Sequence, residues 1–293
     1  MERDEYSGAG SAHTIDGQPK LPGGTLIWDR SGELEEHDVL YSFALEELLC
    51  RQTGEGAAPI VHLWRHPRGF VMGLRDSRLP GAQQAADWLA AQGYAVGVRN
   101  SGGAAVPLDP GVVNVSLILP KRQQGDIDFR DDFERMYLFI REALEDADVA
   151  VDKGEIGGAY CPGDYDLSIG GRKFCGIAQR RQAHAYVVQA FVVAGGFGSA
   201  RAELVREFYR LAAKGQDVDH PRVAAASMAS LEELAAYGAG EAAAERFVRS
   251  VKRTAKRWIG EGAALPPVLP AREEVLRMAD SLRKRYGIQN RQA

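Results

Sequence analysis

The feature that most constrains the fold is an almost unbroken apolar run, Tyr186-Val187-Val188-Gln189-Ala190-Phe191-Val192-Val193. A strand that faces water on one side alternates apolar and polar residues, whereas a strand covered on both faces is apolar nearly throughout. Residues 185–194 are therefore predicted to form a central strand, in a sheet that carries other structure on both of its faces.

Other segments show the periodicity of strands and helices around this run. The predicted strands are 59–64, 69–73, 94–99 and 112–119. The predicted helices are 35–51, 81–92, 131–146, 199–211 (capped by Ser199), 241–258 and 272–285, with a capping box at Ser230. This pattern predicts an α/β fold of the α+β type, with one mixed sheet flanked by helices. We expect a flexible tail at 1–24, the domain at 25–264 and a helical extension at 265–293.

Composition sets limits on the partners and the compartment. The chain has 293 residues, 45% hydrophobic and 26% charged, as in ordinary globular proteins. A net charge of −4 gives no general attraction to nucleic acid or membranes. Three widely spaced cysteines make neither a disulfide framework nor a zinc motif. The charged N-terminus lacks the apolar core of a signal peptide. We therefore expect a cytoplasmic protein.

A glycine hairpin places a lysine close to a cysteine. Gly170-Gly171 joins two short strand-like runs, which predicts a tight turn with Ser168 opposite Lys173 and Asp166 opposite Cys175. Lys173 would then lie on a polar face, outside the core. Its amine would stabilise the Cys161 thiolate as a nucleophile. However, a free cysteine is usually a small buried apolar residue and a strand lysine is usually solvated, so the local pattern leaves both interpretations open.

A second loop, Arg99-Asn100-Ser101-Gly102-Gly103, follows a predicted strand. Paired glycines let backbone N–H groups approach a ligand closely, and Arg99 can add charge. The spacing is that of neither a P-loop nor a dinucleotide fingerprint. Taken alone, the loop fits a tight surface turn at least as well as a binding site.

Together the two loops resemble the signatures of a superfamily. Arg-x-Ser-Gly-Gly-x-Ala-Val at 99–106 is similar to the acyl-covering loop of lipoate–protein ligases, biotin–protein ligases and octanoyltransferases. Gly171-Arg172-Lys173-Phe174-Cys175-Gly176 resembles their second signature. The resemblance extends over residues 40–264. It is closest to the octanoyl-[glycine-cleavage H protein]:protein N-octanoyltransferases, through 76–80 and Tyr160-Cys161-Pro162-Gly163-x-Tyr165-Asp166. The one departure is Cys175, at a position where relatives usually have a small residue without a thiol.

The resemblance implies a reaction and a site. Cys161 would accept an octanoyl group from the lysine of octanoylated glycine-cleavage H protein and pass it to a lysine of an E2 lipoyl domain. The protein would act as a monomer without cofactor or metal. Lys173 would be the catalytic partner of Cys161. The implied substrate-binding residues are Asp76, Arg78, Arg99, Ser101, Gly102, Gly103, Asn114 and Gly176. The residues expected to line the acyl tunnel are Val106, Val113, Val115 and Leu167.

Three alternatives remain open. Within the same fold, the chain could be an ATP-dependent lipoate ligase or a transferase that takes octanoate from acyl carrier protein. A ligase would tolerate loss of Cys161, whereas a transferase would not. The chain could also bind acyl chains or lipoyl domains without catalysis, which a covalent acyl-enzyme would exclude.

Overall fold

The apolar run forms the central strand of the protein, β10 (Ala185–Val193), in a computed structural model that describes residues 21–121, 129–259 and 268–288. The strand order of its mixed sheet is β1-β2-β6-β10-β9-β8-β7. The other strands are β1 (Leu26–Arg30), β2 (Ile60–Trp64), β6 (Val112–Pro120), β7 (Asp152–Lys153), β8 (Leu167–Ile169) and β9 (Arg172–Arg181). Every β10 side chain except Gln189 is buried, so the predicted two-sided cover is confirmed.

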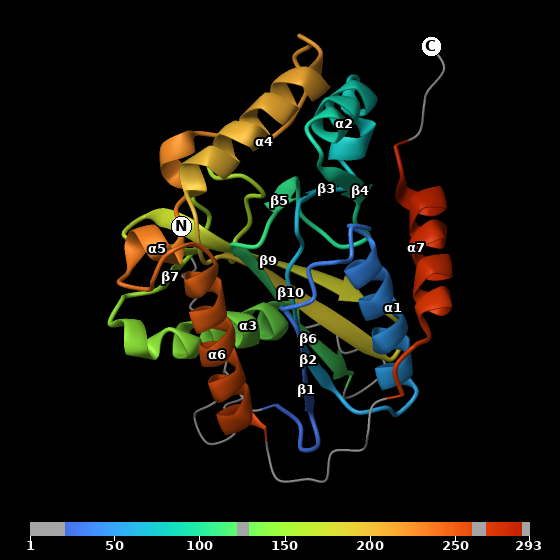
Figure 1. Ribbon diagram of the computed structural model, residues 1–293, viewed down its shortest axis with the longest axis vertical. Helices are drawn as coiled ribbons and strands as arrows, with labels where there is room; N and C mark the ends of the chain where they lie inside the picture. Colours follow the sequence, from blue (N-terminus) through green and yellow to red (C-terminus); the bar gives the residue numbers. More distant parts are fainter. Residues whose placement is uncertain (1–20, 122–128, 260–267, 289–293) are drawn as a thin grey trace, which may run out of the picture.

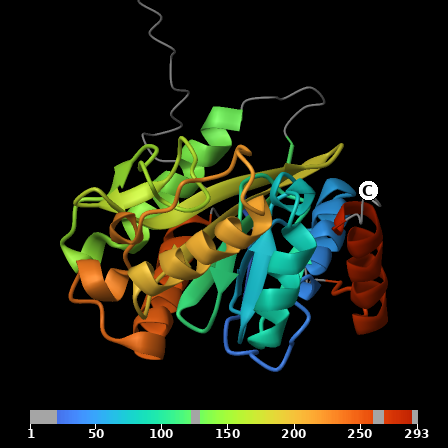
Figure 2. The ribbon, with the colours of Figure 1, turned by 90° about the horizontal axis from the view of Figure 1, so that it is seen from above.

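Helices cover the two faces of this sheet (Figures 1 and 2). One face carries α1 (Tyr41–Gly54) and α7 (Arg272–Tyr286), and the other carries α3 (Phe129–Ala143) and α6 (Gly240–Trp258). Because strand side chains alternate between faces, β6 supplies two cores. Its residues Val112 and Ile118 pack with α1, whereas Val113, Val115 and Leu117 pack with α3 and α6.

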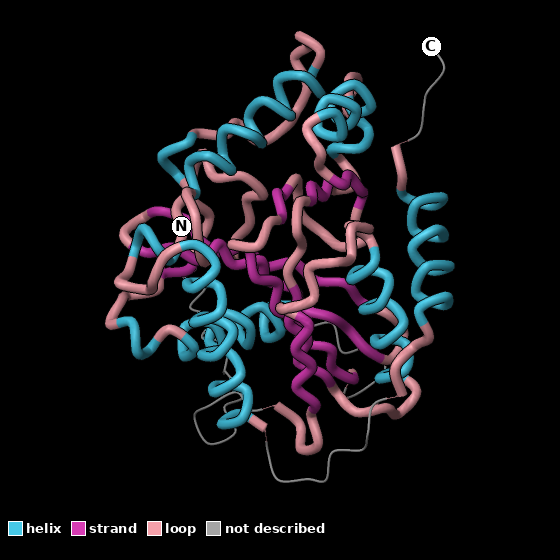
Figure 3. The backbone as a smooth tube through the Cα atoms, viewed as in Figure 1, coloured by secondary structure: helices cyan, strands magenta, loops and turns pink. Residues whose placement is uncertain are grey.

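A smaller sheet lies beside the main one (Figure 3). Its strand order is β4 (Ala95–Val98), β3 (Gly69–Met72), β5 (Val106–Leu108). The helices α2 (Ala82–Ala91) and α4 (Gly198–Ala213) pack against each other over it (Figure 1). A short 3₁₀ turn, η1 (Asp76–Arg78), links β3 to α2. The remaining short helical segments are η2 (Glu145–Ala147), η3 (Ala225–Ser227) and α5 (Leu231–Leu234).

Some predicted helix starts differ from the structure. The helix expected at 35–51 begins at Tyr41, because the Asp38 carboxylate accepts the Leu40 N–H and fixes a turn before it. Ser199 does not cap α4, which begins at Gly198. The Gly198 N–H donates to the Glu233 carboxylate instead, over 2.8 Å. The capping box at Ser230 is confirmed.

The C-terminal helix packs directly on the domain. Val275, Ala279 and Leu282 of α7 are buried in the same core as α1. Arg272 and Arg283 form ion pairs with Glu36 and Asp38. The predicted tail falls almost entirely on residues 1–20, and the predicted boundary between the domain and the helical extension, at 264/265, falls within 260–267. Both stretches lie outside the described residues, so the division into tail, domain and extension stays a prediction. None of the described helices is long and apolar enough to cross a bilayer.

Candidate functional site

The glycine hairpin has the predicted turn but not the predicted register throughout. Gly170 and Gly171 have φ of 58° and 76°, which only glycine adopts at low cost in this type of turn. Ser168 pairs with Lys173 as expected. A bulge after Leu167 then shifts the ladder, so Cys175 pairs with Leu167 and not with Asp166. The bulge frees Asp166 from the ladder.

Lys173 is fully buried, which contradicts the prediction that it lies outside the core. Its Nζ lies 2.7 Å from Asp166 Oδ1 and donates to the carbonyl oxygens of Tyr160 (2.9 Å) and Cys161 (2.6 Å). Burial raises the pKa of the Asp166 carboxyl to about 6, although the Lys173 charge opposes this. A buried ammonium is tolerated here because one carboxylate and two carbonyls replace its water. Sequence reasoning missed Asp166 because it expected this side chain opposite Cys175.

Cys161 is held in an uncommon backbone conformation, with φ of 48°. The Lys173 amine donates hydrogen bonds to the peptide carbonyls on both sides of the Cys161 α-carbon, so it holds the Cys161 loop in place. The Sγ atom itself lies 3.2 Å from the Arg99 guanidinium and 3.2 Å from the backbone N–H of Ala104. A guanidinium and an N–H directed at one sulfur stabilise negative charge on it. The expected stabilising role of the lysine therefore falls to Arg99 and to the glycine loop.

The glycine loop is packed too closely for other residues at two positions. A Cβ on Gly103, where φ is 92°, would lie 2.8 Å from Cys161 Sγ. A Cβ on Gly73 would lie 2.0 Å from the Gly103 carbonyl oxygen. Arg99 also donates to the Ala104 carbonyl over 2.8 Å. The loop is thus clamped between β3 and the thiol.

Asp76 supports this loop from behind. Its carboxylate accepts the Gly73 N–H (2.8 Å) and the Tyr209 hydroxyl (2.9 Å), and that hydroxyl accepts the Ala105 N–H (3.3 Å). Burial raises the pKa of Asp76 above its ordinary value. The structure therefore places Asp76 as a support of the loop, one layer away from the thiol.

Arg78 lies apart from the thiol. Its exposed side chain lines a separate surface pocket, between α2 and the end of α7. Buried Ser101 and exposed Gly102 line another surface pocket, on the outer side of the glycine loop. The structure thus brings Cys161, Lys173, Arg99 and Gly103 together and places Arg78 elsewhere.

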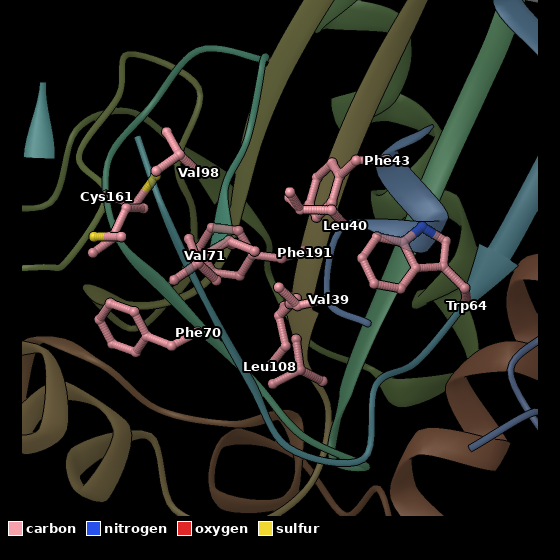
Figure 4. Close-up of a cluster of buried hydrophobic side chains, with 14 of the residues drawn as sticks. Val39, Leu40, Phe43, Trp64, Phe70, Val71, Val98, Leu108, Cys161 and Phe191 are labelled. Atoms are coloured by element: carbon pink, nitrogen blue, oxygen red, sulfur yellow. The ribbon is translucent and has the colours of Figure 1, made fainter. Parts of the chain in front are cut away.

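A narrow cavity leads inward from Cys161 and has a volume of about 20 Å³, little more than one water molecule needs. Figure 4 shows Cys161 on one side of the surrounding apolar cluster and Trp64 on the other. Asn114 and Gly176, which are expected to bind substrate, line the cavity. The rest of its lining is Phe43, Trp64, Val71, Arg99, Leu108, Ser116, Cys161, Ile177, Ala178, Gln189, Ala190 and Phe191.

Most of the expected tunnel residues are wrong. Val113, Val115 and Leu167 lie in the core under α3 and α6, on the other face of the sheet. Successive side chains of a strand point to opposite faces, and Asn114 and Ser116 of β6 face the cavity, so Val113 and Val115 must face away from it. Val106 packs in the same core as Cys161 but does not line the cavity.

A buried carboxylate holds two of the residues that line the cavity, Trp64 and Gln189. This carboxylate belongs to Glu46 of α1, which is 1% exposed. It accepts hydrogen bonds from Trp64 Nε1 over 2.9 Å and from the Gln189 amide, and it lies 2.8 Å from His62 Nδ1. The amphipathic pattern of the helix gave no signal for this network.

The second thiol, Cys175, is separated from Cys161 by the sheet. It is completely buried in the core under α3 and α6, whereas Cys161 lies in the core under α1. Burial raises the pKa of the Cys175 thiol far above its usual range, despite the Lys173 charge. Among the described residues, moreover, no group of His, Cys, Asp and Glu side chains could hold a metal ion.

Comparisons with known proteins give the family. Residues 38–254 match the lipoyl protein ligase A/B catalytic domain. The chain belongs to this family. It is 43% identical to an octanoyl-[GcvH]:protein N-octanoyltransferase of Exiguobacterium sibiricum, over 71% of this chain and 76% of the relative. It is 40% identical to a lipoyl-[GcvH]:protein N-lipoyltransferase of Listeria monocytogenes, over 67% and 72%.

A solved structure supports the fold of this lipoyl ligase family member. A putative lipoate protein ligase from T. acidophilum superposes with a TM-score of 0.61, at 18% identity, covering 91% of this chain and 96% of that one. The predicted fold class, a mixed sheet flanked by helices as in lipoate ligases, is confirmed.

Gly73→Ala should disable the site without unfolding the protein. The new Cβ would push the Gly103 carbonyl, 2.0 Å away, and displace the loop that meets the thiol. A misplacement of about 1 Å costs roughly 10²-fold in rate. Acyl transfer should fall by that amount, and the clash with buried backbone should lower the free energy of unfolding by about 1–3 kcal/mol. The matched control is Gly32→Ala, whose Cβ would meet nothing within 4 Å. Equal rates for the two variants would contradict a fixed loop.

Proposed function

We propose that this protein moves an octanoyl group from the lysine of octanoylated glycine-cleavage H protein to a lysine of an E2 lipoyl domain. One observation carries the proposal: a thiol with two N–H donors at 3.2 Å opens onto a narrow, mostly apolar cavity. The names of the relatives from Exiguobacterium and Listeria support the H protein as donor. We further propose that the protein acts as a monomer in the cytoplasm.

The reaction divides into two acyl transfers. The Cys161 thiolate attacks the amide carbonyl, the C–N bond breaks, and the donor lysine leaves as an amine after taking up a proton. The amine of the acceptor lysine then attacks the thioester, loses a proton and releases the thiolate. Both steps place negative charge on the carbonyl oxygen, and fixed N–H donors stabilise such charge. Arg99 and the Ala104 N–H are the donors nearest to the reacting sulfur.

The acyl chain would occupy the cavity between Cys161 and Trp64. Each buried CH₂ contributes about 0.8 kcal/mol, so an eight-carbon chain gains several kcal/mol there. The present volume of about 20 Å³ is too small for that chain. The side chains that line the cavity must therefore move when the acyl chain enters. Phe191 should move first, because it stacks on Tyr160 beside the thiol.

A lipoyl group is the second candidate for the transferred acyl group. The Listeria relative is named for lipoyl transfer and is nearly as similar as the Exiguobacterium relative. The same thiol and cavity would serve both groups, so the chemistry of the two steps would not change.

The test is transfer between two purified proteins. Octanoylated H protein and an unmodified E2 lipoyl domain are mixed with the enzyme in the absence of ATP, and the mass of the lipoyl domain is followed. The proposal expects octanoylation of the domain. Parallel reactions use lipoylated H protein, octanoyl acyl carrier protein, and free octanoate with ATP. Modification only with acyl carrier protein, or only with ATP, would refute the proposal in favour of the corresponding enzyme, and modification in no reaction would refute it in favour of a binding protein.

A further inference from the structure

Two adjoining surface pockets, together called the groove, extend from the glycine loop to the end of α7. The first, of about 590 Å³, is lined by the outer side of the glycine loop and by Pro162, the neighbour of Cys161. The second, of about 360 Å³, lies between α2 and the C-terminal end of α7. The two share Leu74 and Leu79. Residues at the start of α2 and at the end of α7 line this second pocket, and Figure 1 shows the two helices on the same side of the molecule.

The outer of the two pockets, between α2 and the end of α7, has arginines and no acidic residue in its lining. Arg75 lines the first pocket, and Arg78 and Arg285 line the second. In the described part of the chain, none of the three forms an ion pair, although Arg272 and Arg283 of the same helix α7 do. Arginines without an ion-pair partner in a groove are suited to bind carboxylates, because the planar guanidinium offers paired donors.

The acidic groups of the groove lie in the first pocket. Asp76 is buried and its carboxylate is engaged by Gly73 and Tyr209. Asp219 and His220 line the first pocket on the side of α4, and the His220 ring stacks on Tyr209. The outer pocket, at Arg78 and Arg285, has no acidic residue in its lining.

We propose that Arg78 and Arg285 bind carboxylates on the surface of octanoylated H protein, close to its acylated lysine. This rests on the proposed function, in which the lysine arm of a folded protein reaches Cys161. Pro162, the neighbour of Cys161, lines the first pocket, so a protein surface around a lysine placed at Cys161 would also meet the adjoining outer pocket.

Charge reversal tests this interface. Arg78→Glu, Arg285→Glu and the double variant are compared with Arg277→Glu, which makes the same change on the exposed side of α7 outside the groove. The readout is the initial rate of octanoyl transfer from H protein, as kcat and KM over a range of salt concentrations. A second readout is loading of Cys161 by p-nitrophenyl octanoate, which needs no contact with H protein.

In the double variant, kcat/KM for octanoylated H protein should fall about tenfold or more, mainly through a higher KM, and its dependence on salt should become weaker. Arg277→Glu should stay within about twofold of the wild type. Loading by p-nitrophenyl octanoate should be unchanged in all variants. A double variant that matches Arg277→Glu would overturn the assignment, as would an equal loss with p-nitrophenyl octanoate, because a site for H protein cannot affect that reaction. A wild-type protein that takes nothing from H protein would instead refute the proposed function.

Discussion

Cys161→Ser is expected to reduce octanoyl transfer by about 10⁴-fold or more, the usual cost of removing a catalytic nucleophile. The serine hydroxyl is far less ionised than a thiol. In addition, Arg99 and the Ala104 N–H lie 3.2 Å from the sulfur, so the smaller serine oxygen would lie farther from both donors. Folding should be unaffected because the two side chains are nearly isosteric. The rate is measured with purified H protein as donor, beside a circular dichroism melt.

Cys175→Ser is the matched control for this prediction. Cys175 lies in the opposite core and is not a lining residue of the cavity at Cys161. Its replacement should cost stability by placing a hydroxyl in an apolar core, but the rate of the folded protein should remain near that of the wild type. Loss of transfer in the folded Cys175→Ser protein together with retention in Cys161→Ser would reverse the assignment of the nucleophile.

Lys173→Met is expected to lower the free energy of unfolding by about 3–5 kcal/mol, because it leaves the Asp166 carboxylate buried without its partner. The same change removes the two hydrogen bonds that hold the carbonyls of Tyr160 and Cys161. The Cys161 loop should then relax from its φ of 48° and lose activity as well. Urea unfolding and transfer rates measure the two effects separately.

The pH dependence of this variant has a definite sign. Without Lys173, the native pKa of Asp166 rises above about 6, while the unfolded value stays near 3.9. Between these values the native state holds a proton that the unfolded state has lost, so stability decreases as the pH rises. The wild type shares this slope up to its own Asp166 pKa of about 6, so the stability lost in Lys173→Met should be smallest below pH 6 and grow above it. The double variant with Asp166→Asn should lose this growth and regain part of the stability. A pH-independent loss in Lys173→Met would contradict a buried ion pair.

The sequence predicted the elements better than their environment. The run at 185–194 is the central strand because its apolar side chains leave no face for water. The Gly170-Gly171 turn was also predictable, since positive φ at two successive positions requires such residues. In contrast, β1 and the two-residue β7 were missed, because their pairing with distant strands decides their conformation.

The chemistry of the site was predicted only as a set of residues. The motif resemblance placed Cys161, Lys173, Arg99 and Gly103 in one site, and the structure brings them together. The burial of Lys173 could not be predicted, because it depends on a bulge that turns Asp166 toward it. The tunnel residues were wrong because a strand pattern shows which residues share a face but not which face carries the site.

The most direct test of the central claim is the intact mass of the enzyme after mixing with octanoylated H protein without ATP. We expect one added octanoyl group that hydroxylamine removes, located on Cys161 by peptide mapping and absent from Cys161→Ser. The same adduct should disappear when a lipoyl domain is added. An adduct mapped to Cys175, or transfer to the lipoyl domain with no acyl-enzyme at any time point, would contradict a thioester on Cys161.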